Sequence, residues 1–160
     1  MNLDAFRKQA QDRRKPNKVF LKRLKKRPPK HLDQQVQELH DEVFEELDCL
    51  DCANCCKTTS PIFLPKDIER LARHFRQRPA EFIEQHLYLD KEGDYVLHQA
   101  PCPFLGPDNY CSVYESRPRA CREYPHTNRK RFQQILDLTY RNTQVCPAVL
   151  EIVERLKAAF

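Results

Sequence analysis

The placement of cysteine is the feature of this sequence that most limits how the chain can fold. Eight cysteines occur in 160 residues, and four of them follow one another in the pattern C-x2-C-x2-C-C. In chain order they are Cys49, Cys52, Cys55, Cys56, Cys102, Cys111, Cys121 and Cys146. Two-residue spacers let a turn aim successive sulfurs at one centre, and this spacing recurs in zinc knuckles and iron–sulfur loops. The pattern therefore predicts a metal site for which all eight cysteines are candidate ligands.

Whether such cysteines bind metal or form disulfides depends on the compartment in which the protein works. Residues 1–15 contain no apolar stretch like that of a secretory signal. No uncharged apolar run approaches the roughly 18 residues of a membrane span. We therefore expect a cytoplasmic protein with no membrane partner, in which thiols stay reduced. Disulfide pairing is the alternative, for a secreted chain that has lost its signal.

The identity of the metal is less constrained than its presence. Eight thiolates suffice for two tetrahedral zinc sites, two cubane iron–sulfur clusters or one of each. Cys49, Cys52 and Cys55 have the spacing of the first three ligands of a bacterial ferredoxin cluster, whose fourth ligand is remote and precedes a proline. Two downstream cysteines precede a proline, at positions 102 and 146. The sequence therefore favours an iron–sulfur cluster as cofactor, with Zn²⁺ as the alternative.

Cys56 departs from the ferredoxin pattern because it follows Cys55 directly. Adjacent side chains diverge, so the two thiols either serve different sites or leave one of them free. A free thiol at either position would be the one candidate nucleophile that the sequence offers.

Helical spacing of apolar residues predicts a mostly α fold with short strands and cysteine-rich loops, a small α+β protein organised around a Cys-ligated metal site. Proline is expected to end a helix at residue 16 and again at 28–29. We expect helices over 3–14, 18–26, 32–47, 66–76, 79–87 and 147–159, a strand over 95–99, loops over 101–125, and either a helix or a strand over 131–140.

Several enzyme classes lack support in this sequence. There are two glycines, Gly93 and Gly106, which excludes a Rossmann fingerprint, a Walker A loop and a G-x-S-x-G nucleophile elbow. None of the six histidines lies in an H-E-x-x-H motif. The sequence leaves open whether the protein is an enzyme.

Charge is distributed unevenly along the chain. The net charge is +5, but residues 1–30 alone hold twelve Lys or Arg against two Asp, and the rest of the chain is net acidic. We predict a basic N-terminal arm over 1–31 ahead of a cysteine-cluster domain over 32–160. The arm either contacts nucleic acid or another polyanion, or folds onto the acidic segment 33–48.

Downstream of the C-x2-C-x2-C-C burst, the chain carries Cys-Pro-Phe-Leu at 102–105, Cys-Ser-Val-Tyr at 111–114, Arg-Pro at 117–118, Cys-Arg at 121–122 and Tyr-Pro at 124–125. With this set, the sequence over 49–147 resembles the YkgJ-type cysteine-cluster proteins, also described as the CxxCxxCC zinc- or iron-chelating domain family. The resemblance implies a metal or iron–sulfur site built by the cysteines of a bacterial cytosolic protein. Flagellin lysine N-methylase has a similar cluster, which implies methyl transfer within the group. The basic arm lies outside the resemblance.

Charged and aromatic residues accompany the cysteines in these motifs. Arg117, Arg119 and Arg122 surround Cys121, where guanidinium groups would offset thiolate charge and tune a redox potential. Alternatively, they pair with Glu115, Glu123 or other carboxylates. We expect Tyr114 and Tyr124 to pack around the loops rather than act in catalysis.

Histidine is a second candidate ligand type. His98 and His126 flank the cysteine-rich region and could each replace a cysteine. The remaining four, His31, His40, His74 and His86, are expected to be ordinary helix residues.

Three functions follow from these patterns. The first is a metal-binding module with a structural or chelating site and no catalysis of its own. The second is an iron–sulfur enzyme or electron carrier in redox or methyl-group transfer. The third is a nucleic-acid-binding adaptor that uses the arm while the metal holds the body together.

Overall fold

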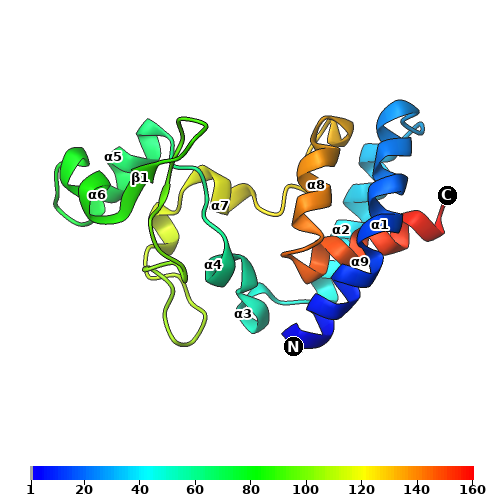
Figure 1. The fold of residues 1–160 in the computed structure, drawn as a ribbon, viewed down its shortest axis with the longest axis horizontal. Helices are drawn as coiled ribbons and strands as arrows, with labels where there is room; N and C mark the ends of the chain where they lie inside the picture. The colour runs from blue at the N-terminus through cyan, green and yellow to red at the C-terminus, as the bar shows by residue number, and fades with distance from the viewer. Residues whose placement is uncertain (1) are drawn as a thin grey trace. The chain divides into compact units, whose positions relative to one another are not determined.

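The computed structural model describes residues 2–160, which divide into two compact units (Figure 1). Unit 1 combines the chain up to Cys52 with Pro125–Phe160, and unit 2 is Ala53–Tyr124. The predicted boundary at residue 31 stays a prediction. Within residues 2–160, every helix is too short or too polar to cross a lipid bilayer.

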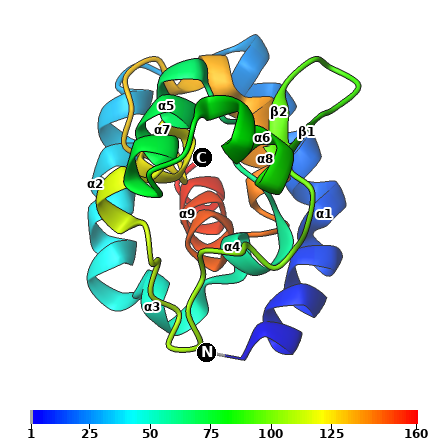
Figure 2. The same ribbon diagram turned by 90° about the vertical axis from the view of Figure 1, so that its left-hand side faces the viewer.

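Unit 1 is a small helical bundle in which α9 (Pro147–Ala158) packs against both α1 (Leu3–Lys26) and α2 (Leu32–Glu46) (Figure 2). Proline suits the first turn of α9, since the missing N–H would have no partner there. Apolar residues at helical spacing turn one face of each helix inward. The buried core of unit 1 contains Phe20, Leu21, Leu24, Leu32, Val36, Val43, Phe132, Leu136, Ala148, Val149, Ile152, Val153 and Leu156.

The prediction of two short helices separated by Pro16 is wrong. The side chain of Asn2 accepts a hydrogen bond from the backbone N–H of Ala5, and α1 then continues through Pro16 to Lys26. An internal proline costs a helix about 3 kcal/mol. Phe20 and Leu24 are buried beyond it, and each contributes roughly 1.5–3 kcal/mol by leaving water. Tertiary burial therefore outweighs the local cost of the proline.

The other helix predictions are confirmed with small shifts at their ends. The helix predicted over 32–47 is α2, which ends at Glu46. The residues left undecided form a 3-10 turn, η2 (Phe132–Ile135), followed by α8 (Leu136–Asn142). In unit 2, the two predicted helices are α5 (Pro65–His74) and α6 (Pro79–His86).

A two-stranded antiparallel sheet lies in unit 2. The predicted strand is present as β2 (Tyr95–Leu97), and it pairs with β1 (Leu87–Leu89), which the sequence analysis did not predict. Their register joins Leu87 to Leu97 and Leu89 to Tyr95. The buried core of unit 2 contains Phe63, Ile68, Leu71, Ala72, Phe82, Leu87, Leu97, Phe104 and Val113. The protein is thus mostly helical with a small sheet, as predicted.

Short elements carry several of the cysteines. In unit 1, α3 is the single turn Cys49–Cys52. In unit 2, the short elements are α4 (Asn54–Thr58), η1 (Tyr114–Ser116) and α7 (Arg119–Glu123), and the segment between β2 and η1 is mostly irregular.

Candidate metal centre

Four cysteines of unit 2 come from four separate segments. Cys56 lies in α4 and Cys121 in α7, whereas Cys102 and Cys111 lie on the two sides of a turn over 106–110, in the irregular stretch after β2. The backbone N–H of Cys102 donates to the carbonyl oxygen of Cys56 at 2.8 Å, and an isolated bridge pairs Leu105 with Cys111. These backbone contacts join the segments that carry Cys56, Cys102 and Cys111.

Among these four thiols, Cys121 has the most strongly shifted pKa. Its pKa is raised to about 12, mainly by burial and also by the nearby thiols of Cys56, Cys102 and Cys111. The pKa of Cys102 is likewise raised, by burial and then by Cys56 and Cys111. Repulsion of this kind acts only over short distances, so the four thiols lie in one neighbourhood, although among the described residues no three of their sulfur atoms come within 4.8 Å of one another. We call them the unit 2 thiol group: Cys56, Cys102, Cys111 and Cys121.

Backbone amides point at two of these sulfurs. Cys102 accepts hydrogen bonds from the N–H groups of Phe104 and Leu105, and Cys111 accepts one from Val113; these bonds lower the pKa values of the two thiols. Phe104 and Val113 are buried in the core of unit 2, which fixes the backbone that presents the amides. Hydrogen bonds to sulfur are a feature of thiolate-held metal centres. The donor set and its amides therefore fit zinc or an iron–sulfur cluster.

Cys56 differs from the other members because its pKa is lowered, to about 7. A hydrogen bond with the Cys55 thiol is the main cause, and the charge of Arg117 adds to it against the opposing effect of burial. Cys55 is thus placed beside the unit 2 thiol group through its neighbour. All eight cysteines lie in the described part of the chain, and none of them forms a disulfide.

Arg117 is the arginine that acts on the thiols. Its positive charge lowers the pKa values of Cys56, Cys111 and Cys121. Its guanidinium carbon lies 3.8 Å from the centre of the ring of Tyr114, an exposed residue, in a cation–π contact. Arg119 instead pairs with Glu123 at 2.7 Å, as the alternative interpretation predicted.

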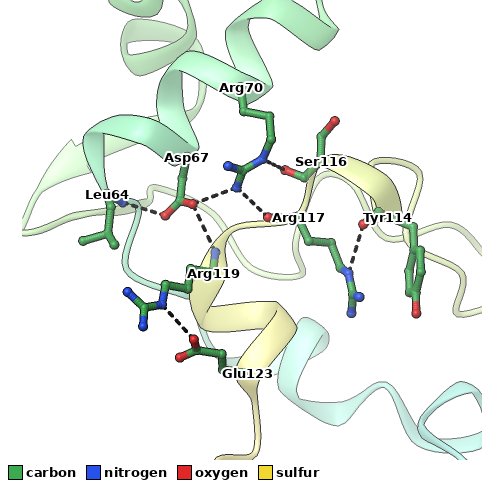
Figure 3. Close-up of polar contacts among 8 residues, drawn as sticks. All are labelled: Leu64, Asp67, Arg70, Tyr114, Ser116, Arg117, Arg119 and Glu123. Carbon is green, nitrogen blue, oxygen red and sulfur yellow. Dashed lines mark hydrogen bonds and ion pairs between the residues drawn. The ribbon is translucent and has the colours of Figure 1, made fainter.

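A buried carboxylate holds the segment that carries Arg117 (Figure 3). Asp67 accepts hydrogen bonds from the backbone N–H of Leu64 at 2.9 Å and of Arg119 at 3.1 Å, and it pairs with Arg70 at 2.8 Å. Arg70 in turn donates to the carbonyl oxygen of Arg117 at 2.8 Å. The sequence analysis missed Asp67 and Arg70. The one local signal was an acidic residue at the third position of a helix that begins with proline.

Three further cysteines gather in unit 1. Cys49 and Cys52 are the two ends of α3, and Cys146 precedes the first residue of α9. The pKa of Cys146 is raised to about 12, mainly by burial and also by Cys49 and Cys52, while hydrogen bonds from the N–H groups of Val149 and Ala148 oppose the shift. We call Cys49, Cys52 and Cys146 the unit 1 thiol group. The burst of four cysteines is therefore divided after Cys52.

Of the two candidate ligands His98 and His126, His98 has a hydrogen-bond partner away from the thiols, and so does His40, which was expected to be an ordinary helix residue. The Nε2 atom of His98 lies 2.6 Å from the carbonyl oxygen of Gln85, and Nδ1 of His40 lies 2.7 Å from Oγ1 of Thr127. His126 has a left-handed backbone conformation, with φ of 66°. The contact of His98 joins the residue after β2 to the last turn of α6.

A cluster of carboxylates occupies the turn between β1 and β2. The oxygens of Asp90, Glu92 and Asp94 lie within 4.8 Å of one another. An oxygen of Asp90 accepts the backbone N–H groups of Glu92 and Asp94, both at 2.9 Å. The local geometry of the turn explains the cluster.

Comparison with known proteins agrees with the cysteine pattern. The model of the CxxCxxCC family, described as "Putative zinc- or iron-chelating domain", matches residues 48–147. That range contains both thiol groups and Cys55. Comparisons with curated proteins and with solved structures gave no match. The match covers more than half of the chain, and the protein belongs to the CxxCxxCC family of zinc- or iron-chelating domains.

Proposed function

We propose that this protein binds metal through cysteine and that the unit 2 thiol group holds one complete four-thiolate centre. The convergence of Cys56, Cys102, Cys111 and Cys121 from four segments carries this proposal. Four thiolates satisfy either a closed zinc site or a cubane cluster.

Each part of the site has a definite task in this proposal. The four thiols supply the ligands, and the amides of Phe104, Leu105 and Val113 orient two of the sulfurs. Arg117 offsets the negative charge that the thiolates bring. A bound iron–sulfur cluster would supply one-electron transfer, whereas Zn²⁺ would supply a cross-link between the four segments.

We infer that the bound form is an iron–sulfur cluster. Each thiol group contains one cysteine that precedes proline, Cys102 in unit 2 and Cys146 in unit 1, which is the sequence typical of the remote ligand of ferredoxin clusters. This arrangement supports a second centre that involves the unit 1 thiol group. We place the protein in the reducing cytoplasm, where such thiols stay available for metal.

Metal and acid-labile sulfide analysis of protein purified without oxygen tests the proposal. We expect iron, sulfide and a broad absorbance near roughly 400 nm that dithionite bleaches. Stoichiometric zinc in a colourless sample would show that the centre is zinc rather than an iron–sulfur cluster. The proposed ligands would stay the same. A chain without either metal would contradict the proposal altogether.

A pair of variants tests the ligand assignment. Cys121→Ser should lower the metal content per chain, because it removes one of four ligands. Ser116→Ala changes a neighbouring side chain and should leave the content unchanged. Equal metal contents in the two variants would exclude Cys121 as a ligand.

A further inference from the structure

The basic segment at the start of the chain has a surface that the metal centre does not use. Ten Lys or Arg and two Asp lie in α1, which gives the helix a charge of +8. All ten basic residues are exposed. Four of the lysines, Lys8, Lys15, Lys22 and Lys26, follow one another at intervals of seven or four residues and so share a face. We call these four residues the lysine stripe.

The opposite face of α1 is committed to the interior of unit 1. Ala10, Asn17 and Leu24 are buried and follow Lys8, Lys15 and Lys22 by two residues each, which is about 200° around a helix of 3.6 residues per turn. Packing of this face fixes α1 in unit 1, where α1 contacts α8 and α9. The lysine stripe therefore points away from the core of its unit.

Among residues 2–160, no carboxylate forms an ion pair with the lysine stripe, although the charge of Lys22 acts on Asp137, the partner of Lys25. In residues 2–160, the ion pairs of α1 are Arg7 with Asp4 and Lys25 with Asp137, and neither involves a residue of the stripe. The acidic helix α2 instead uses Glu46 and Glu42 to pair with Arg155 of α9, at 3.0 and 3.7 Å. The alternative in which the arm neutralises the segment 33–48 therefore gains no support from ion pairs among the described residues.

The geometry of the stripe selects among polyanions. Lys8, Lys15 and Lys22 lie about 10.5 Å apart along the axis, at a rise of 1.5 Å per residue, comparable with the roughly 12 Å major groove of a DNA duplex. The exposed large apolar side chain of α1, within the described residues, is Val19 alone, which leaves no apolar face to enter a membrane. No exposed aromatic side chain of α1 offers the stacking surface on which single strands depend.

From these observations we propose that the lysine stripe binds the phosphate backbone of double-helical nucleic acid without regard to sequence. The contacts are between lysine ammonium groups and phosphate oxygens, so affinity comes from release of counterions. The proposal does not depend on the identity of the metal.

Titration of the purified, metal-loaded protein with fluorescent 24-base-pair DNA and RNA duplexes tests this proposal. Four phosphate contacts should make affinity fall on the order of 100-fold between 50 and 200 mM salt. The triple variant Lys8→Gln, Lys15→Gln, Lys22→Gln should lower the slope of log K against log salt by about 3. The triple variant Lys66→Gln, Arg73→Gln, Lys91→Gln removes the same charge from exposed positions of unit 2 and should keep the slope. The two duplexes distinguish DNA from RNA as the source of phosphate.

Three results would overturn the proposal. The first is absence of binding to either duplex at 50 mM salt. The second is an equal loss of affinity in the two triple variants, which would show that binding depends on the net charge of the protein and not on the lysine stripe. The third is tighter binding to single strands or to vesicles with phosphatidylserine than to duplexes.

Discussion

Arg117 lies where a group of thiolates would otherwise accumulate negative charge. In the metal-free site the thiols are protonated and neutral, so the guanidinium of Arg117 stabilises them little. A metal held by four thiolates carries net negative charge, and the guanidinium stabilises that charge. Arg117→Gln should therefore weaken metal retention at neutral pH by about tenfold, the equivalent of a change near 1.4 kcal/mol. Competition with a chelator measures this, with either metal in the site.

Arg122→Gln is the matched control for this prediction. Arg122 is exposed and lies next to Cys121, and no action of its charge on the thiols is seen. Equal losses in the two variants would show that general charge, rather than the position of Arg117, governs retention.

Asp67 is the buried residue on which the segment of Arg117 depends. Its side chain is 3% exposed and accepts two backbone N–H groups besides the pair with Arg70. Loss of one partner from a buried charged network costs about 3 kcal/mol. Asp67→Asn should therefore lower the free energy of unfolding by about that amount in urea denaturation. Glu69→Gln, on the exposed face of the same helix, should change it by less than about 0.5 kcal/mol. Similar losses from both would contradict the role of Asp67.

At this scale the sequence predicted the candidate ligands but not their grouping. The spacing of Cys49, Cys52, Cys55 and Cys56 suggested one local site, whereas the chain passes from unit 1 to unit 2 within the burst. The course of the loops decides whether a downstream cysteine joins the unit 1 or the unit 2 thiol group. No local sequence pattern encodes the course of those loops. Arg117 could be proposed from its place beside Cys121. Asp67 could not, because its link to the segment of Arg117 runs through the backbone N–H of Arg119, 52 residues away in sequence.

Helix α1 shows how an element overrides its own local signals. Pro16 cannot donate a backbone hydrogen bond, yet the helix continues because residues on both sides of it are buried on one face. Pro16→Ala should restore the donor and raise the free energy of unfolding by about 1–3 kcal/mol. Urea denaturation measures the change. Pro28→Ala, in the connection between α1 and α2, should change stability by less than about 1 kcal/mol. A destabilised Pro16→Ala variant would mean that the packing of α1 depends on Pro16 itself.

Other elements followed from local patterns to different extents. Helices α2, α5, α6 and α9 bury apolar residues at helical spacing, and proline begins three of them, so both their existence and their starts were predictable. Strand β1 has three residues and follows α6 without a break. Its conformation depends on pairing with Tyr95–Leu97, and pairing of this kind leaves no signal in the three residues themselves.

The two units differ in how much of their order comes from side-chain packing. Unit 1 is built from helices whose two core clusters bury thirteen and three residues, whereas the core cluster of unit 2 buries nine, and unit 2 includes the irregular segment that carries Cys102 and Cys111. An irregular segment with few core residues depends more on cross-links for its order. The order of the chain hides this division, because residues 125–160 return to unit 1.

Removal of the metal should therefore loosen unit 2 more than unit 1. Hydrogen exchange followed by mass spectrometry, before and after chelation under anaerobic conditions, measures this region by region. We expect peptides over 101–124 to exchange at least about tenfold faster after chelation, because the thiols lose the ion that joins their segments. Peptides from α1 and α2, which hold Phe20 and Val36 in the core of unit 1, should keep their protection. The Cys121→Ser variant, as purified, should show the same pattern without chelator. Equal acceleration in both units, or none in 101–124, would mean that the metal does not organise unit 2.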